Sequence, residues 1–382
     1  MKRLIPSIIL LLILAGCQKQ KTPEELFEER ASGVVVVLNE YYFKLKLPNG
    51  NSVYFTGFDE DGDLENFTSD EDEVKSNRKI MTGTGFFVDE KGTIMTNRHV
   101  AEPQLDIIQA KNAYVKLIKA VKELVEYGKS QIEEQYAELE SEKENCSYYD
   151  LNTSTYYYDS EKLEEINDKQ KELAESYQEA NNTLEQIEGL TDPSAMKVES
   201  KCKIGIAYHD TYITGIEDFL GSNECVVSIV SEKDDVDLAL IQLKNKITPE
   251  KAYVFDVTGM RTEKESLVEQ MSDIVNQEDN DGQLRINQQL YMIGYNAGLV
   301  LGTTKQGIKV QMTSGKLTQS PDGQRLLYSI PTMTGSSGSP VIDEKGRLVG
   351  VNFAKLNGTD NFNFGIPIEA VRSFYDPFYG LR

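Results

Sequence analysis

Positive charge and histidine are scarce in this sequence. Its 382 residues contain 40 Lys and Arg against 62 Asp and Glu, which gives a net charge of −22, and there are only two histidines. Nucleic acids and anionic lipid surfaces bind through clusters of Lys and Arg, so the lack of any such cluster argues against both as partners. The acidic surplus indicates a soluble, self-repelling chain. Hydrophobic residues make up 39%, including 14 Phe and 20 Tyr, which is enough for one large core or two smaller ones.

The apolar run near the N-terminus is too short to span a bilayer. It covers residues 4–14, follows two basic residues and precedes "LAGC", so it predicts a secretory signal. "LAGC" also resembles the bacterial lipobox, in which the cysteine, here Cys17, is acylated and becomes the mature N-terminus. We therefore expect removal of residues 1–16 and a lipid anchor in the bacterial cell envelope, facing the periplasm or the exterior. Gln18 favours the outer membrane by the same resemblance; a plain signal peptide is the alternative.

Cysteine is rare, with four residues in all. Beyond Cys17, Cys202 and Cys225 flank strand-like runs and can face each other across a hairpin. A disulfide between them suits a compartment outside the cytoplasm, although the sequence does not fix the connectivity. Cys146 is then left over, as a free thiol or an intermolecular link.

Short strand-like segments occupy most of the chain. Residues 17–31 hold a tether and a short charged helix, which begins at Thr22 with a capping box. Two apolar strands then flank a turn at residues 89–92, acidic residues in 57–77 predict a mobile loop, and many short strands recur from Ile204 onward. Many strands with few helices predict a mainly β fold, either a sandwich or a barrel. Its two parts would cover residues 32–101 and 199–382.

The region between these two parts has a different pattern. Apolar residues repeat every seven positions over about 104–145 and again over 160–188, the second time interrupted by the polar Gln170. Such stripes predict two helices that pack as an antiparallel, coiled-coil-like hairpin, inserted as residues 102–198. Its tyrosine-rich tip can dock a partner, although solvated tyrosines are the simpler interpretation. A helix-like stretch at about 258–286 predicts a second, smaller insertion.

Three residues carry the candidate chemistry. His99 follows the second apolar strand, Asp237 opens the apolar segment "DLALIQL", and Ser337 lies in a Gly-x-Ser-Gly turn. Each is weak evidence alone, because such positions are usually structural. Together they occur in the order His, Asp, Ser of the chymotrypsin-type triad, which predicts nucleophilic catalysis by Ser337. The second histidine, His209, has no matching context and is expected to be structural.

The sequence blocks around these residues resemble the trypsin-like serine proteases of the bacterial HtrA/Deg kind. "GTGFFVDEKGTIMTNRHV" is similar to the family's histidine block, "DDVDLALIQL" to its aspartate block and "GSSGSPV" to its serine block. Ser339 stands where the HtrA type more often has glycine, a form that also resembles the glutamyl endopeptidases. The resemblance implies a double six-stranded β-barrel and a serine endopeptidase that needs no cofactor and no metal. It also implies an oxyanion hole made by the backbone N–H groups of Gly335 and Ser337.

Departures from the family pattern concern activation and specificity. Ser336 stands where animal trypsins carry the acid that a freed N-terminus engages, so that mode of activation is not expected. Pro331 occupies the place of an acidic pocket base, which disfavours cleavage after Arg or Lys. Thr332 and Asn352 fall on pocket-wall positions with Lys355 nearby, and the resemblance then implies a small or polar P1 residue, with an acidic one as the weaker possibility.

The sequence after the last matching block, near Ile368, is too short for the PDZ domain that HtrA enzymes usually carry. We therefore expect the helical hairpin to supply spacing, regulation, or the docking of a partner protein or another copy of the chain. The alternative function is an inactive scaffold on a protease fold, tethered to the membrane and binding partners through the hairpin. An intact triad with its oxyanion glycine favours the enzyme, which would act on protein or peptide substrates of the envelope or exterior.

Overall fold

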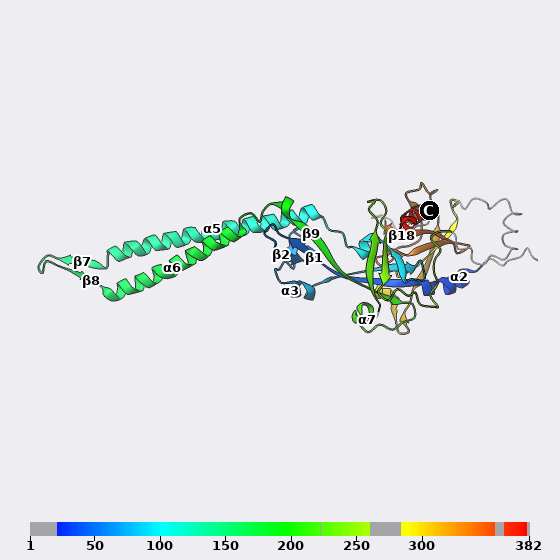
Figure 1. Cartoon of the computed structure of the whole chain (residues 1–382), viewed down its shortest axis with the longest axis horizontal. Coiled ribbons are helices and arrows are strands. Elements are labelled where there is room, and N and C mark those ends of the chain that lie inside the picture. Colours follow the sequence, from blue (N-terminus) through cyan, green and yellow to red (C-terminus); the bar gives the residue numbers. More distant parts are fainter. Residues whose placement is uncertain (1–20, 222, 260–283, 356–362, 380–382) are drawn as a thin grey trace, which may run out of the picture. The chain divides into compact units, whose positions relative to one another are not determined.

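A computed structural model of the protein describes residues 21–221, 223–259, 284–355 and 363–379 (Figure 1). The predicted lipidation site at Cys17, the predicted signal peptide and most of the predicted insertion at 258–286 lie outside the described residues. No helix in the described ranges is long and apolar enough to cross a membrane. The chain divides into two compact units. The first comprises Met1–Tyr41, Lys79–Gln104 and Cys202–Arg382, and the second comprises Tyr42–Arg78 and Leu105–Lys201.

The predicted capping box at the first helix is confirmed. Helix α2 (Pro23–Arg30) begins where the Thr22 hydroxyl accepts a hydrogen bond from the Glu25 amide at 3.2 Å, and the Glu25 carboxylate accepts one from the Thr22 amide at 2.7 Å. Both bonds satisfy amides that the first helical turn leaves without partners. The 3₁₀ helix η1 (Ala31–Gly33) follows α2. Buried Arg30, the last residue of α2, donates to the Gly346 carbonyl at 2.9 Å and lies over the Tyr253 ring. Helix α2 is thereby fixed to the β-rich part of the chain that follows.

The first sheet closes into a barrel. Its strand order is β2-β1-β5-β6-β11-β10-β9, and a further pairing between β1 and β9 joins the ring. Alternate side chains of these strands, among them Val35, Val37 and Ile241, fill its interior. The predicted turn after β5 is confirmed, and Gly92 supplies its positive φ of 72°. The strands are β1 (Val34–Lys46), β2 (Ser52–Phe55), β5 (Lys79–Phe87), β6 (Thr93–Thr96), β9 (Lys197–Tyr208), β10 (Glu224–Val230) and β11 (Ala239–Leu243).

The second sheet has six strands in the order β15-β12-β17-β18-β19-β16. A bridge between Leu317 and Tyr328 links its two edges. One continuous core contains side chains from both sheets, such as Val36 and Ile293, so the two barrels pack directly against each other. This arrangement confirms the predicted mainly β, double-barrel fold. The strands are β12 (Gln289–Gly294), β15 (Gln311–Lys316), β16 (Leu326–Tyr328), β17 (Pro340–Asp343), β18 (Leu348–Lys355) and β19 (Asn363–Pro367), followed by helix α10 (Ile368–Tyr379).

The acidic segment 57–77 is not the mobile loop that its composition predicts. It forms β3 (Gly57–Phe58), β4 (Leu64–Glu65) and helix α3 (Glu71–Ser76) in the second unit. Glu71 accepts hydrogen bonds from the Tyr42 hydroxyl at 2.6 Å and the Tyr54 hydroxyl at 3.2 Å. These bonds, the one from Tyr42 foremost, hold the pKa of Glu71 below its usual range. The prediction was wrong because the tyrosines that order this segment lie in other strands.

Two long helices form the hairpin in the second unit (Figure 1). Helix α5 (Ile107–Glu144) packs against α6 (Ser160–Ile187), and strands β7 (Ser147–Asp150) and β8 (Thr155–Tyr158) pair at the tip. Gln170, which interrupts the heptad pattern, is buried and bonded on both sides: its amide donates to Glu140 at 2.6 Å and accepts from Lys143 at 3.3 Å. The tip exposes five tyrosines, at 148, 149, 156, 157 and 158.

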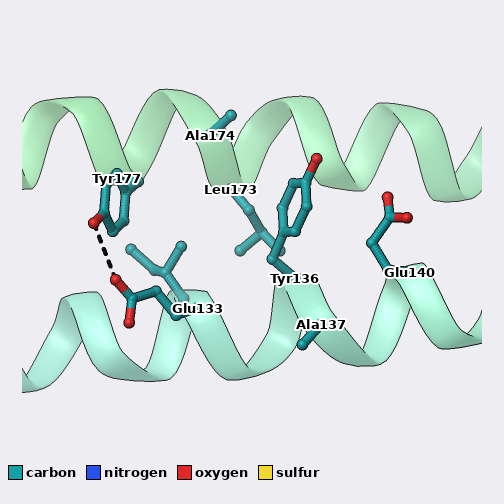
Figure 2. Close-up of a pocket in the computed structure, with 8 residues that line it drawn as sticks. Glu133, Tyr136, Ala137, Glu140, Leu173, Ala174 and Tyr177 are labelled. Carbon is teal, nitrogen blue, oxygen red and sulfur yellow. Dashed lines mark hydrogen bonds between the residues drawn. The ribbon is translucent and has the colours of Figure 1, made fainter.

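A groove of about 620 Å³ opens between α5 and α6 (Figure 2). Its walls are mostly apolar, and Glu133 accepts a hydrogen bond from the Tyr177 hydroxyl at 3.0 Å within it. The groove is therefore an apolar surface with carboxylates on its lining. The lining residues are Ile132, Glu133, Tyr136, Ala137, Glu140, Leu173, Ala174 and Tyr177.

The predicted disulfide between Cys202 and Cys225 is absent from the structure. Strands β9 and β10 do pair, but Cys225 lies opposite Ile204 and not opposite Cys202. Cys225 is buried, and this burial raises the pKa of its thiol to about 12, whereas Cys202 is exposed. The prediction was wrong because the register, which the sequence does not specify, sets the two thiols two residues apart along the ladder.

Candidate active site

His99 and Asp237 come together because their strands are neighbours. β6 pairs with β11 with Thr96 opposite Ala239, so the residues just beyond these strand ends meet. His99 lies in the single-turn helix α4 (Arg98–Ala101), and its Nδ1 is 2.6 Å from Asp237 Oδ2. The His99 amide also donates to Asp237 Oδ1 at 3.0 Å. The carboxylate is thus held at both oxygens, and the imidazole is held by the carboxylate.

This contact decides which ring nitrogen of His99 is available. A carboxylate accepts hydrogen bonds, so Nδ1 carries the proton and Nε2 is left with its lone pair. Asn97 also holds Asp237 in place, because its side-chain amide donates to the Asp237 backbone carbonyl at 2.7 Å. His99 is half-buried, so its ring remains accessible. The pair is a hydrogen-bonded base with an orienting carboxylate.

The turn around Ser337 depends on two glycines. Gly335 has φ +97° and Gly338 has φ +88°, a region that favours glycine. A Cβ at Gly335 would collide with the backbone of Gly298, and one at Gly338 would collide with the carbonyl of Thr84. The Ser337 carbonyl accepts a hydrogen bond from the Thr84 amide at 2.8 Å, which fixes the turn against β5. The stretch is a tight, packed turn and not a flexible linker.

Backbone amides in this turn divide into two groups. Those of Ser336, Gly338 and Ser339 donate to the carbonyls of Met333 at 3.0 Å, Asn352 at 2.8 Å and Ser336 at 3.0 Å. In the described part of the chain, the amides of Gly335 and Ser337 make no hydrogen bond. Gly335 is buried and Ser337 is partly accessible, so two donors beside one serine are left without a protein acceptor. They are the two that the resemblance assigns to an oxyanion hole.

Hydrogen bonds to the Ser336 carbonyl set the direction of the Ser337 amide, because the two groups share one peptide plane. Asn352 donates through Nδ2 to the Ser336 carbonyl at 2.9 Å, and the Ser339 amide donates to the same oxygen. In a trans peptide the C=O and the next N–H point in opposite directions. Bonds to the Ser336 carbonyl therefore hold the Ser337 N–H pointing away from Asn352. The Tyr328 hydroxyl in turn donates to Asn352 Oδ1 at 2.7 Å.

Ser337 and the segment that holds His99 both lie against strand β5. A Cβ at Gly83 would lie 3.2 Å from the Ser337 carbonyl oxygen and 2.6 Å from the side chain of Val100, the residue after His99. Within the described residues no hydrogen bond joins the Ser337 hydroxyl to the His99 ring. The structure thus brings His99 and Asp237 into contact and sets Ser337 against the same strand, and a working triad stays a prediction.

Ser337 differs from the two serines beside it. Ser336 is buried, and its hydroxyl donates to the Met333 carbonyl at 2.7 Å. Ser339 is fully buried, and its hydroxyl has no partner in the described part of the chain. Only Ser337 of the three is partly accessible. Access by solvent therefore favours Ser337 as the nucleophile.

The predicted pocket residues are bonded inside the second barrel. The Thr332 hydroxyl donates to Asn363 Oδ1 at 2.8 Å, and the Asn363 amide donates to the Ile330 carbonyl at 2.6 Å. Asn352 is 2% exposed and bonded as described above. A pocket role for these two stays a prediction, and the structure gives each an internal role. The side chain of Lys355 lies outside the described residues.

His209, expected to be structural, lies away from the candidate triad. Its Nδ1 accepts a hydrogen bond from the Val310 amide at 3.1 Å, and its burial lowers its pKa. Thr84 is the residue that sequence reasoning missed, although it stands in the quoted histidine block "GTGFF". In the sequence it is marked only by its place between two glycines, which does not reveal its burial.

Residues 212–351 match the family model described as "Trypsin-like peptidase domain". The chain contains a trypsin-like peptidase domain. The matched part includes Asp237 and Ser337, while His99 precedes it. No curated protein matches the sequence. Among solved structures, a serine endoprotease from Yersinia pestis is similar with a TM-score of 0.41 and 11% identity, over 94% of this chain and 67% of that one. In general class the domain is that of a serine protease.

Proposed function

We propose that the protein is a serine endopeptidase that works through His99, Asp237 and Ser337. The amides of Gly335 and Ser337 are the observation that carries the proposal, because they leave two donors available beside the serine, as stabilisation of an oxyanion requires. The contact between His99 and Asp237 at 2.6 Å supports it independently. The remaining geometry is typical of an apo site, where the serine and the base often meet closely only when substrate binds.

The proposed reaction has two steps. Ser337 Oγ attacks the peptide carbonyl while His99 Nε2 takes its proton, and the carbonyl oxygen becomes an oxyanion between the two amides. When the C–N bond breaks, His99 gives this proton to the leaving amine and an acyl-enzyme remains. Water then attacks the ester with His99 as the base, which releases a carboxylic acid and regenerates Ser337. Asp237 holds the tautomer and stabilises the imidazolium throughout.

More finely, we propose an HtrA/Deg-like enzyme of the bacterial cell envelope, lipid-anchored through Cys17. The sequence blocks around the three residues support the first part, and the basic start, apolar run and "LAGC" support the second. Protein or peptide substrates follow from the reaction. Docking of a partner or a second copy on the hairpin is supported by its exposed tyrosines and by the groove between its helices.

A fluorophosphonate probe tests the proposal, since it labels only activated serines. We expect wild-type protein to be labelled, and Ser337→Ala and His99→Ala to lose the label. Ser339→Ala is the matched control: it removes a hydroxyl two residues away that bonds to nothing described, so labelling should persist. Wild-type protein that stays unlabelled, even with added protein substrate, would refute the enzyme and favour the scaffold.

A further inference from the structure

Thr84 lies in β5, fully buried between the two barrels. Its strand belongs to the first sheet, where it stands opposite Val36. Its hydrogen bonds, however, run mainly to segments of the second barrel. This makes it a link between β5, which pairs with the strand before His99, and the turn that carries Ser337.

The amide, the carbonyl and the hydroxyl of Thr84 all form hydrogen bonds, and the hydroxyl both donates and accepts. Its hydroxyl donates to the Gly335 carbonyl at 2.8 Å and accepts from the Tyr295 amide at 3.0 Å. Its amide donates to the Ser337 carbonyl at 2.8 Å, and its carbonyl accepts from the Thr96 hydroxyl at 2.7 Å. The side chain therefore joins the nucleophile turn to the segment after β12, and the backbone joins the same turn to β5.

Gly335 is the residue that most needs such a bond. Glycine has more backbone freedom than any other residue, and Gly335 adopts a φ of +97°, which other residues rarely adopt. The hydroxyl of Thr84 holds the Gly335 carbonyl, while the following amide, that of Ser336, is held by Met333. Together these bonds fix the peptide plane on the C-terminal side of Gly335. The Thr84 amide fixes the Ser337 carbonyl in the same turn.

We propose that Thr84 is a positioning residue for the oxyanion hole, a role that rests on the proposed function. Its hydroxyl keeps Gly335 in the conformation that presents the N–H, so that stabilisation of the oxyanion is ready before substrate arrives. A valine fills the same volume without the hydroxyl, and a serine keeps the hydroxyl without the methyl. The two substitutions therefore separate hydrogen bonding from packing.

The experiment compares Thr84→Val and Thr84→Ser in the full chain, by peptide-cleavage kinetics and by hydrogen exchange of the segment 333–339. Thr84→Val should lower kcat by roughly tenfold to a hundredfold with KM changed by less than about threefold, since one oxyanion donor is worth about a hundredfold or more. Exchange in the segment should become faster. Thr84→Ser should stay within about threefold of wild type on kcat and keep the slow exchange.

Thr248→Val is the matched control. The Thr248 hydroxyl has the same bonding pattern, since it accepts from the Gly92 amide at 2.9 Å and donates to the Asp89 carbonyl at 2.6 Å, but it serves the turn after β5. It should lose comparable stability and leave kcat unchanged. A Thr84→Val enzyme with normal kcat overturns the proposal, and so does a Thr84→Ser enzyme as slow as the valine variant. If wild-type protein neither labels nor cleaves, the proposed function fails, and unchanged exchange in Thr84→Val then overturns the positioning role separately.

Discussion

Removal of one hydroxyl inside the second barrel should measurably weaken the fold. Tyr328 is fully buried, and its hydroxyl donates to Asn352 Oδ1 at 2.7 Å and lies 3.2 Å from the Phe364 carbonyl. Burial raises the pKa of Tyr328, so the hydroxyl remains a donor across the working pH range. Tyr328→Phe keeps the ring and leaves Asn352 Oδ1 buried without a donor. A buried acceptor without a partner costs about 1–3 kcal/mol.

We expect the free energy of unfolding to fall by about 2 kcal/mol in Tyr328→Phe, seen in urea as a lower midpoint with an unchanged slope. Tyr291→Phe is the control, because its hydroxyl, on strand β12 of the same sheet, makes no hydrogen bond within the described residues. That variant should stay within about 0.5 kcal/mol of wild type. Since Asn352 also aims the Ser337 amide, fluorophosphonate labelling of Tyr328→Phe should be slower as well. A Tyr328→Phe protein as stable as the control would refute the reasoning.

Three further outcomes are expected. Ser339→Ala removes a buried hydroxyl without a described partner, so urea unfolding should show equal or higher stability, by up to about 1 kcal/mol, and a clear loss would contradict this. Burial lowers the pKa of His209 below its ordinary 6.5, so the unfolded chain binds the proton more readily and stability should fall as pH drops below 6.5. His209→Asn, which keeps an acceptor for Val310, should show a smaller fall between pH 7.5 and 5.5, and equal slopes would count against it. Replacing residues 118–183 with a short Gly-Ser turn should alter protein-substrate choice or assembly but not small-peptide cleavage; unchanged behaviour in every assay would refute a role for the hairpin.

Local chemistry explains which parts of the fold could be predicted. The capping box at Thr22 and the turn at Gly92 depend on residues within four positions of each other, and both are present. The double barrel follows from resemblance of the sequence blocks, not from composition. The failures concern distant partners: tyrosines of other strands order Glu71, and the register of β9 against β10 separates Cys202 from Cys225.

The candidate site shows the same division. His99, Asp237 and Ser337 could be selected because each lies in a recognisable local context. The bonds made by Thr84 and Asn352 could not, because they join residues separated by 251 and 16 positions. Nothing in a linear sequence marks which buried hydroxyl or amide reaches the nucleophile turn. Such support is specified only when the chain has folded.

Under the proposed function, the two amides beside Ser337 have a consequence for the end of the reaction. Hydrolysis of the proposed acyl-enzyme would leave a carboxylate at the new C-terminus of the product. Its negatively charged oxygens would accept hydrogen bonds from the N–H groups of Gly335 and Ser337, as the oxyanion would. On this proposal the cleaved peptide would be a ligand for the site that made it, and its accumulation should slow turnover. A donor pair that serves the transition state would then also expose the protein to inhibition by its own product.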